Sequence, residues 1–475
     1  MARLSRRRFV ARSGAAAALA LAGPTLLLKG QEGASKRLNI AVIGALGKGQ
    51  SDTANVADEH TIVALVDVDK GRLDQAAAGL ARGRTKSGKA AGTAPKLFTD
   101  FRKMFDDMSK QIDAVIISTP DHTHFAAAMA AIKHQKHVCV QKPLCNYIGE
   151  VRKLAAAAKA AGVVTQMGNQ GRTLEGQRQA KEWIEQGAIG TLTEVRLWTN
   201  RPIWPQGPLE KKVATAPESL DWDLWLGVEP AEPYFTFDPP AGVKDKRNST
   251  TVHPFAWRGW WQFGSGALGD MGCHIMDATF SILGQRIPSK IDVVSSPVTA
   301  LQGPVWTQLA YHFDKSEKFP ALAVSWHDGT KDGQPNKPVR DPRVPEEAFN
   351  KASSGMMFIG TEGVVYEGDA YCRAPKIFPE ARAAEIAGKG AIKQTETRST
   401  HPGNPQLEWA SAIVNGGKPS SNFEYAAPLA EFVLLGNLAL RSGQTVQWDA
   451  KQAKVTNVAA ANQFVERPAY RAGWV

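Results

Sequence analysis

A glycine-rich turn near the start of the chain has the residues of a phosphate-binding loop. The apolar segment 39–44 runs into Gly44-Ala45-Leu46-Gly47-Lys48-Gly49, and a helical pattern follows. Such a turn lets backbone N–H groups and a helix N-terminus bind a pyrophosphate. The usual dinucleotide spacing would place glycine at 44, 46 and 49. Because Leu46 departs from that spacing, the turn alone also fits an ordinary strand-to-helix connection.

Asp67 favours the dinucleotide interpretation. It ends the next apolar segment, 23 residues after Gly44, where a carboxylate can accept hydrogen bonds from both ribose hydroxyls. A carboxylate at this point repels a 2′-phosphate, so the sequence predicts NAD as the cofactor and disfavours NADP. Arg72 would weaken that preference if it faced the ribose, although its position also fits a solvated helix surface.

Polar residues follow two further apolar segments. Segment 114–118 leads into Thr119-Pro120-Asp121-His122-Thr123-His124, and segment 137–141 ends in Gln141-Lys142-Pro143. Ligands bind at the carboxyl ends of the strands in open parallel sheets. We therefore predict that the cofactor is contacted by Gly44, Leu46, Gly47, Lys48, Gly49, Asp67, Thr119, Pro120, His124, Gln141 and Lys142.

Asp270 and His274 lie four residues apart after the glycine-rich run 264–269. A helix beginning after this run would place both on one face. The segment also fits a helix with a capping Asp and a packed His. Oxidising a carbinol needs a base that takes the hydroxyl proton while hydride leaves the carbon, and histidine, with an ordinary pKa of about 6.5, suits that role. Asp270 would then orient the imidazole or hold a substrate hydroxyl.

The elements that position these residues follow from the apolar pattern. Between residues 36 and 168, short and mostly continuous apolar segments alternate with amphipathic helical stretches such as 125–134 and 147–160. This pattern is typical of a parallel sheet covered on both faces. We predict an α/β protein with an N-terminal doubly wound Rossmann domain, with strands at 39–44, 61–67, 96–98, 114–118, 137–141 and 163–167.

Residues 169–475 differ in character. Looser alternation, dense Trp and Pro-rich insertions predict a C-terminal α+β domain for substrate binding and oligomerisation, with a large mixed, mostly antiparallel open sheet. Its last helix is expected at 428–441, ending before Gly443. Seven of the 13 Trp fall between Trp198 and Trp261. Aromatic faces beside polar side chains suit a sugar or cyclitol ring, although ordinary core packing is an equal alternative. The substrate candidates are Asn169, Arg201, Trp204, His253, Trp257 and Arg258.

Composition and charge limit the function classes. The chain has 475 residues, of which 43% are apolar and 22% charged, as in soluble globular proteins of two or three domains. Six of the basic residues lie in residues 1–35 with one acid, and the remainder of the net charge of +11 is spread without a long basic run. We therefore expect no nucleic-acid partner. The spacing of the four Cys indicates neither a disulfide framework nor a metal site, so buried thiols and no metal are expected.

The first 35 residues read as a targeting segment. Ser5-Arg6-Arg7-Arg8-Phe9 precedes an apolar run, 14–28, that is interrupted by Gly23-Pro24. This is the pattern of a twin-arginine export signal, and the run is too short and broken for a stable membrane span. It predicts an exported, periplasmic or otherwise extracytoplasmic protein. The protein would be membrane-anchored if the small-residue site Ala20-Leu21-Ala22 were not cleaved.

Three motifs together resemble a known family. Thr119-Pro120 with His124, the Lys142-Pro143 pair and the segment 266–277 are similar to the glucose/fructose oxidoreductase, inositol dehydrogenase and rhizopine-catabolism (Gfo/Idh/MocA) family. The segments 198–207, 220–227 and Tyr470-Arg471-Ala472-Gly473-Trp474 resemble an exported branch of it. The resemblance implies that Lys142, Asp270 and His274 form the catalytic group. Lys142 would stabilise the developing alkoxide. The family commonly has Glu-Lys-Pro where this chain has Gln141, which removes a charge beside the lysine.

The resemblance leaves three functions open. The first is an exported NAD-dependent oxidoreductase acting on a sugar, glycoside or cyclitol. Since free NAD is scarce outside the cytosol, such an enzyme is expected to hold its cofactor tightly. The second is a redox-neutral, glycoside-cleaving enzyme that uses bound NAD. The third is a non-catalytic carbohydrate-binding protein on the same scaffold, favoured by Leu46 and Gln141 but opposed by the retention of all three catalytic candidates. Analogy with the family also indicates a homo-oligomer.

Overall fold

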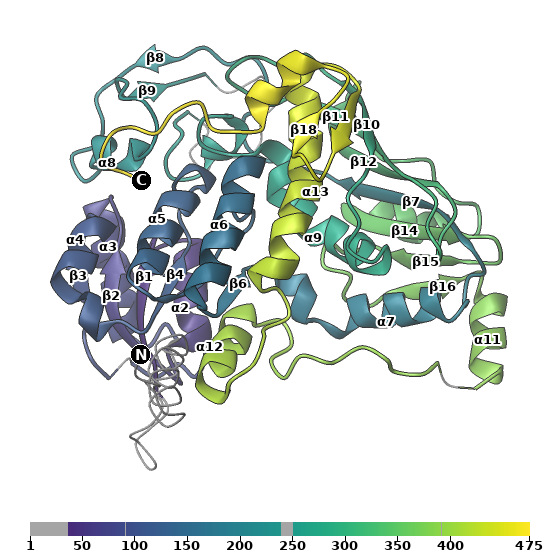
Figure 1. Ribbon diagram of the computed structural model, residues 1–475, viewed down its shortest axis with the longest axis horizontal. Coiled ribbons are helices and arrows are strands. Elements are labelled where there is room, and N and C mark those ends of the chain that lie inside the picture. The colour runs from purple at the N-terminus through teal and green to yellow at the C-terminus, as the bar shows by residue number, and fades with distance from the viewer. Residues whose placement is uncertain (1–36, 91, 239–249, 391) are drawn as a thin grey trace, which may run out of the picture.

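The computed structural model describes residues 37–90, 92–238, 250–390 and 392–475. The predicted export signal lies outside these residues. Two large sheets lie side by side, and the chain passes from one to the other near residue 170 (Figure 1).

The N-terminal sheet is parallel throughout, with strand order β3-β2-β1-β4-β5-β6. Three of its strands, β2 and the central pair β1 and β4, consist largely of Ile, Val, Leu and Ala and are mostly buried. Burial on both faces is the condition under which strands with continuous apolar runs are stable. The bounds are β1 Asn39–Ile43, β2 Thr61–Val66, β3 Lys96–Phe98, β4 Ala114–Ile117, β5 His137–Val140 and β6 Thr165–Met167. The Rossmann prediction is confirmed.

Helices cover both faces of this sheet. The apolar sides of α4 (Phe101–Met108), α5 (Asp121–Lys133) and α6 (Ile148–Ala161) pack on one face. On the other face lie α2 (Lys48–Val56), α3 (Lys70–Ala81) and, from the far end of the chain, α12 (Pro405–Asn415). The C-terminal region therefore completes the N-terminal domain.

The second sheet is mixed and mostly antiparallel, as predicted. Its path is β16-β15-β14-β7-β12-β11-β10-β17-β18, and β7 with β12 is the parallel pair. Along β11 buried and partly exposed residues alternate, so one face packs on the core and the other is more open. The bounds are β7 Leu192–Thr199, β10 Lys290–Ser295, β11 Trp306–Phe313, β12 Leu322–Lys331, β14 Ser354–Gly360, β15 Val364–Glu367, β16 Lys376–Phe378, β17 Val446–Asp449 and β18 Lys454–Val455.

Two buried helices join the domains. Helix α9 (Gly266–Ile282) packs against α13 (Phe423–Ser442), and α13 also packs against α6 of the first domain. Helix α13 begins five residues before the predicted start, because Asn422 caps its N-terminus and Pro428 is accommodated inside the helix. Among the described helices, α13 alone is long and apolar enough to cross a membrane, and 89% of its apolar window is buried in the protein.

Shorter elements complete the described chain. They are α7 Glu175–Glu185, α8 Trp222–Leu226, α10 Glu346–Lys351, α11 Glu380–Gly388, β8 Lys212–Val213, β9 Phe235–Thr236, β13 Gln334–Pro335, and the 3-10 helices Ser109–Gln111, Gln170–Thr173, Ala256–Gly259 and Ala459–Phe464.

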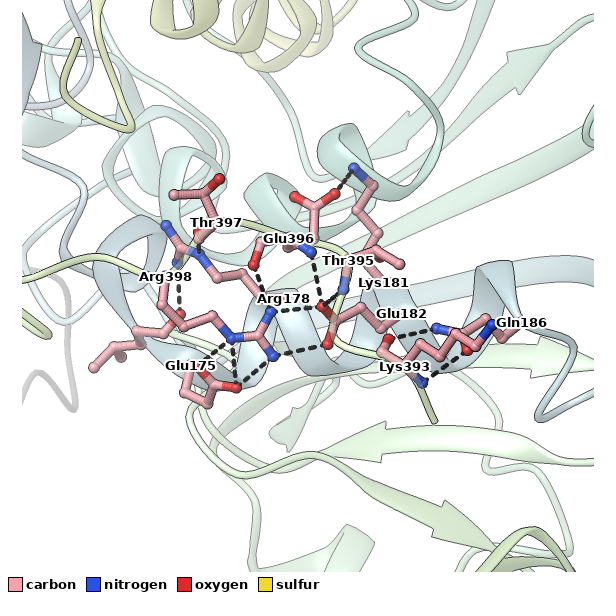
Figure 2. A network of polar contacts seen from close by, with 11 residues as sticks. Glu175, Arg178, Lys181, Glu182, Gln186, Lys393, Thr395, Glu396, Thr397 and Arg398 are labelled. Carbon is pink, nitrogen blue, oxygen red and sulfur yellow. Dashed lines mark hydrogen bonds and ion pairs between the residues drawn. The ribbon is translucent and has the colours of Figure 1, made fainter. Parts of the chain in front are cut away.

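An ionic network holds the segment 393–398 along α7 (Figure 2). Glu182 accepts hydrogen bonds from the backbone N–H groups of Thr395 and Glu396 at 2.7 and 2.9 Å and from the guanidinium of Arg398 at 2.5 and 2.8 Å. Arg398 hydrogen-bonds the buried Glu182, which lowers the pKa of that carboxyl to about 2. The link between α11 and α12 is thereby fixed to the second domain.

Candidate active site

A cavity of about 600 Å³ lies where the carboxyl ends of the parallel strands meet the second domain. Its volume falls within the range of roughly 300–1,000 Å³ that is usual for ligand and cofactor sites. Residues from the β1–α2 turn, the ends of β2, β4 and β5, helix α9 and the aromatic loops after β7 line one continuous space. The cavity therefore joins the predicted cofactor residues to the predicted catalytic residues.

The glycine turn fits a pyrophosphate despite its irregular spacing. Gly44 has φ +85°, and a Cβ there would lie 2.7 Å from the Ser118 carbonyl carbon. Gly47, at φ +71°, is the residue that caps the N-terminus of α2. The second glycine of the usual pattern is therefore found one residue later, at the helix cap 47 instead of at 46. Leu46, Gly47 and the backbone around them still face the cavity. Gly49 does not line it; a Cβ at this position would lie 1.7 Å from the Gly44 oxygen, so its role is to close the turn.

Asp67 and Arg72 both face the cofactor side of the cavity. Asp67 accepts hydrogen bonds from the N–H groups of Ala45 and Asp69, each at 3.1 Å, so its carboxylate is fixed in place. Burial raises the pKa of Asp67, and the bound N–H and the Arg72 charge oppose that rise. A guanidinium nitrogen of Arg72 lies close to Gly47. Arg72 is therefore part of the cavity wall and not a solvated helix residue.

Lys142, Asp270 and Arg258 form a charged cluster in the cavity. The Lys142 ammonium donates to the Asp270 backbone oxygen at 2.5 Å and to its Oδ1 at 2.8 Å, and Arg258 Nε donates to the same Oδ1 at 3.2 Å. Burial alone would raise the pKa of Asp270, but the two cations hold it well below its usual value. The predicted meeting of strand β5 with the distant helix α9 is present in the structure.

His274 lies one turn along α9 from Asp270 and lines the same cavity. Within the described chain no hydrogen bond joins the two side chains, and the buried Nδ1 of His274 has no partner. The expectation that Asp270 orients the imidazole is therefore wrong for this structure, because Lys142 and Arg258 occupy the carboxylate. Burial, and then the Lys142 charge, lower the pKa of His274 well below its usual value. Both effects favour the neutral form of the imidazole.

Asp121 lines the cavity but is not among the site residues predicted from the sequence. It is the first residue of α5, is 4% exposed, and accepts a hydrogen bond from Ser265 Oγ at 2.6 Å. Burial raises its pKa to about 7, while the nearby Lys142 and Arg258 oppose the rise. Its place directly after Pro120 at a strand end is the signal that would have identified it.

The structure explains why residue 141 is a glutamine and not a glutamate. Its Nε2 donates at 2.8 Å to Oδ2 of Asp52, a fully buried carboxylate of α2 that also accepts from Ser118 at 2.8 Å. Lys48 and Gln406 bind the other oxygen. A glutamate at 141 would place a second carboxylate against Asp52. The neutral Gln141 therefore serves as a hydrogen-bond donor to the buried Asp52.

Besides Gly49, three predicted site residues lie outside the cavity wall because their polar atoms are used in the fold. The His124 ring nitrogens contact the carbonyl oxygens of Pro143 and Thr119 at 2.8 and 2.9 Å, and burial lowers its pKa to about 4. Asn169 donates to Asp277 and accepts from Ser421. Trp204 donates to Gln206 at 2.9 Å and is buried in the aromatic core around α8. The predictions that these three residues contact a ligand are corrected: their hydrogen bonds stabilise the fold around the cavity.

The remaining predicted substrate residues reach the cavity. Arg201, Trp257 and Arg258 line it, as do Phe255 and Tyr371. Trp257 and Trp225 are the two cavity residues among the seven clustered Trp, all of which are described; the others pack in the cores. The edge of Tyr371 meets the His274 ring at a centroid distance of 4.9 Å.

His253 also lines the cavity, but on the cofactor side. Its Nε2 lies 3.1 Å from Oδ2 of Asp69, and this contact lowers the pKa of Asp69 to about 2. Because the imidazole is engaged by a residue just after β2, its assignment to the substrate is corrected. His253 braces the end of β2 beside Asp67.

The fold and the site define the class of protein: a two-domain dinucleotide-dependent oxidoreductase. Family comparison agrees. Residues 38–169 match the model described as oxidoreductase family, NAD-binding Rossmann fold, and residues 191–319 match the C-terminal alpha/beta domain of the same Gfo/Idh/MocA family. Together the two matches span more than half of the chain, which belongs to the Gfo/Idh/MocA oxidoreductase family.

Individual relatives are more distant. The chain is 25% identical over 169 residues to myo-inositol 2-dehydrogenase of Thermotoga maritima, and 29% identical over 188 residues to levoglucosan dehydrogenase of Pseudarthrobacter phenanthrenivorans. These matches cover 36% and 39% of this chain, and only 46% and 36% of those relatives.

Solved structures show the same fold over nearly the whole chain. The WlbA dehydrogenase of Bordetella pertussis, solved with NADH and UDP-GlcNAcA, has a TM-score of 0.57 at 13% identity, and the match covers 87% of this chain and 99% of that one. A levoglucosan dehydrogenase in complex with NADH has a TM-score of 0.53 at 18% identity and covers 86% and 99%.

Proposed function

We propose that the protein is an NAD-dependent dehydrogenase that oxidises a secondary hydroxyl group of a sugar, glycoside or cyclitol. The observation that carries this proposal is the Lys142–Asp270–Arg258 cluster with His274, in one cavity with the glycine turn and Asp67. The relatives named as inositol and levoglucosan dehydrogenases support the substrate class.

The chain's own residues have complementary roles in this proposal. NAD, when bound, supplies a hydride acceptor; the turn at Gly44–Gly47 and the N-terminus of α2 hold its pyrophosphate. Lys142, held by Asp270, donates to the substrate oxygen and stabilises the negative charge that grows on it as the carbon loses hydride. His274, neutral because of its low pKa, takes the hydroxyl proton. Arg258 keeps Asp270 ionised, so that the ammonium stays oriented.

Asp67 favours NAD over NADP. Its carboxylate is fixed by two backbone N–H groups at the position where a ribose binds, and a 2′-phosphate there would meet a negative charge. A guanidinium nitrogen of Arg72 lies close to Gly47 of the turn, which supports a role beside the pyrophosphate.

Export and a tightly held cofactor belong to the same proposal. The twin-arginine segment at residues 5–9 supports export in the folded state, with the cofactor loaded in the cytosol. In an extracytoplasmic compartment such an enzyme works repeatedly only if a later step re-oxidises its cofactor in place. That step is hydride return to a second sugar, or to the same sugar after cleavage of a glycosidic bond.

A substrate screen tests the activity. Purified protein is incubated with NAD and a panel of monosaccharides, disaccharides and inositols while the absorbance of reduced nicotinamide is followed. We expect one structural class of polyol to give reduction that is lost in Lys142→Ala. Sugar binding that persists unchanged in Lys142→Ala, without reduction by any panel member, would indicate a binding protein instead.

Two further measurements test cofactor retention and export. Denaturing release of dinucleotide from purified protein is expected to give near-stoichiometric NAD, and a cleanly apo, freely exchanging protein would contradict tight retention. Cell fractionation is expected to find the protein outside the cytosol, and replacement of Arg6 and Arg7 by Lys is expected to retain it inside. Unchanged distribution in that variant would contradict twin-arginine export.

A further inference from the structure

The C-terminal tail, which the proposed mechanism does not use, ends in the wall of the cavity. After the last 3-10 helix the chain crosses the top of the N-terminal domain and ends beside α8 (Figure 1). Trp474, the penultimate residue, is 8% exposed and lines the cavity, whereas Val475 after it is 64% exposed. A large apolar side chain at the end of a chain is thus buried against the site.

Buried charges anchor this tail. Arg467 is buried, donates to Glu150 of α6 at 2.6 Å and also binds Glu229, which follows α8. Tyr470 donates to the same Glu150 at 2.9 Å. Arg471 donates to Asp223 of α8 at 2.6 Å. These contacts tie the tail to both domains, so the position of Trp474 is built into the fold.

Trp474 lies at one end of the cavity. Its ring meets Phe101, the first residue of α4, edge to face at 5.9 Å, and the Arg102 guanidinium lies 4.0 Å from its centroid. Arg102 also donates to the Gly473 oxygen at 3.1 Å. Phe101 and its neighbours follow β3, the outer strand next to β2, whereas Lys142 follows β5 on the other side of β1.

This end is where the adenosine half of a dinucleotide belongs. In a doubly wound sheet the carboxylate after the second strand binds the adenosine ribose, so the base lies beyond Asp67, away from the nicotinamide and Lys142. An adenine ring is flat and has a π-face that packs well on an aromatic side chain. The cavity wall beyond Asp67 includes Thr99, Asp100, Phe101 and Trp474.

We propose that Trp474 is an adenine-binding residue, and that the tail 467–474 is a built-in clasp over the adenosine half of the cofactor. The proposal rests on the proposed NAD-dependent function and extends it: the clasp accounts for retention of the cofactor. The proposal assigns cofactor binding to the terminal motif Tyr470–Trp474, which takes no part in the proposed reaction.

Binding of ADP-ribose, which lacks nicotinamide, tests the proposal. Calorimetry on the full chain compares the wild type with Trp474→Ala, Trp474→Phe and a chain lacking only Val475. Loss of base–aromatic stacking predicts ADP-ribose and NAD binding weaker by about ten- to a hundredfold in Trp474→Ala. Trp474→Phe retains most of the affinity, and removal of the exposed Val475 leaves it unchanged. Wild-type affinity in a folded Trp474→Ala protein would overturn the clasp while leaving NAD dependence intact.

Limited digestion of the wild type with carboxypeptidase gives a second test that needs no variant. ADP-ribose is expected to protect the tail from trimming, and nicotinamide mononucleotide is not. Equal trimming with and without ADP-ribose, where calorimetry shows that it binds, would overturn the proposal. Failure of the wild type to bind either NAD or ADP-ribose would instead refute the proposed function together with the clasp.

Discussion

Replacing Lys142 with Met removes the ammonium at the tip of β5 while keeping a long, unbranched side chain. In the structure the Lys142 side chain is 14% exposed, and its ammonium makes two contacts with Asp270. A preorganised donor to a developing oxyanion is worth roughly 10²–10³ in turnover. We therefore expect kcat of Lys142→Met to fall by at least about 10²-fold, which corresponds to about 2.7 kcal/mol of transition-state stabilisation.

Cofactor affinity in the same variant separates catalysis from binding. The pyrophosphate and ribose contacts come from the turn after β1 and from Asp67, so the Kd for NAD is expected to stay within about threefold of wild type. Asp270 keeps Arg258 as a partner at 3.2 Å. The free energy of unfolding should therefore fall by about 2 kcal/mol, less than when a buried charge loses its only partner.

The assay follows reduced nicotinamide with the best polyol from the substrate screen, and calorimetry gives the Kd. The matched control is Lys153→Met, which removes an exposed ammonium that pairs with Glu466 at 2.8 Å on the outside of α6. That variant should keep full turnover and lose less than about 1 kcal/mol of stability. If Lys142→Met retained more than a tenth of wild-type kcat, or lost NAD binding to the same extent as turnover, the assigned role of Lys142 would be refuted.

Three further predictions concern the carboxylates around the cavity. Asp67→Ala removes the charge that repels a 2′-phosphate, so the ratio of kcat/KM with NADP to that with NAD should rise about tenfold or more; an unchanged ratio would show that Asp67 does not face the ribose. Gln141→Glu places a carboxylate against the buried Asp52, so denaturant unfolding should show a loss of about 2 kcal/mol at pH 8 that shrinks as the pH falls and a proton is taken up; a more stable variant would contradict this. Asp121 has its pKa raised from 3.8 to about 7, so the folded state binds a proton more tightly than the unfolded chain, and the stability that this group contributes at low pH is lost as the pH rises from about 4 to 7. Asp121→Asn should flatten that slope and remove an ionisation near pH 7 from the kcat/KM profile, whereas an unchanged profile would exclude Asp121 as its source.

The sequence by itself determined the parts of the protein that depend on neighbours along the chain. The apolar runs of β1 and β4 predict buried parallel strands because only a sheet covered on both faces can bury them. The four-residue spacing of Asp270 and His274 predicts a shared helix face for the same local reason. Asp67 follows its strand as a ribose-binding carboxylate must. Each of these predictions depends only on residue types and their spacing along the chain.

Tertiary structure decided which of those residues meet and which polar groups remain available. Lys142 and Asp270 are 128 positions apart, and their pairing leaves His274 without the carboxylate that its spacing offered. His124, Asn169 and Trp204 carry polar atoms that would suit a binding site, but buried hydrogen bonds within the fold already occupy those atoms. Trp474 and α12 complete the N-terminal domain from the far end of the chain, because chain folding and not sequence distance determines which surfaces are buried together.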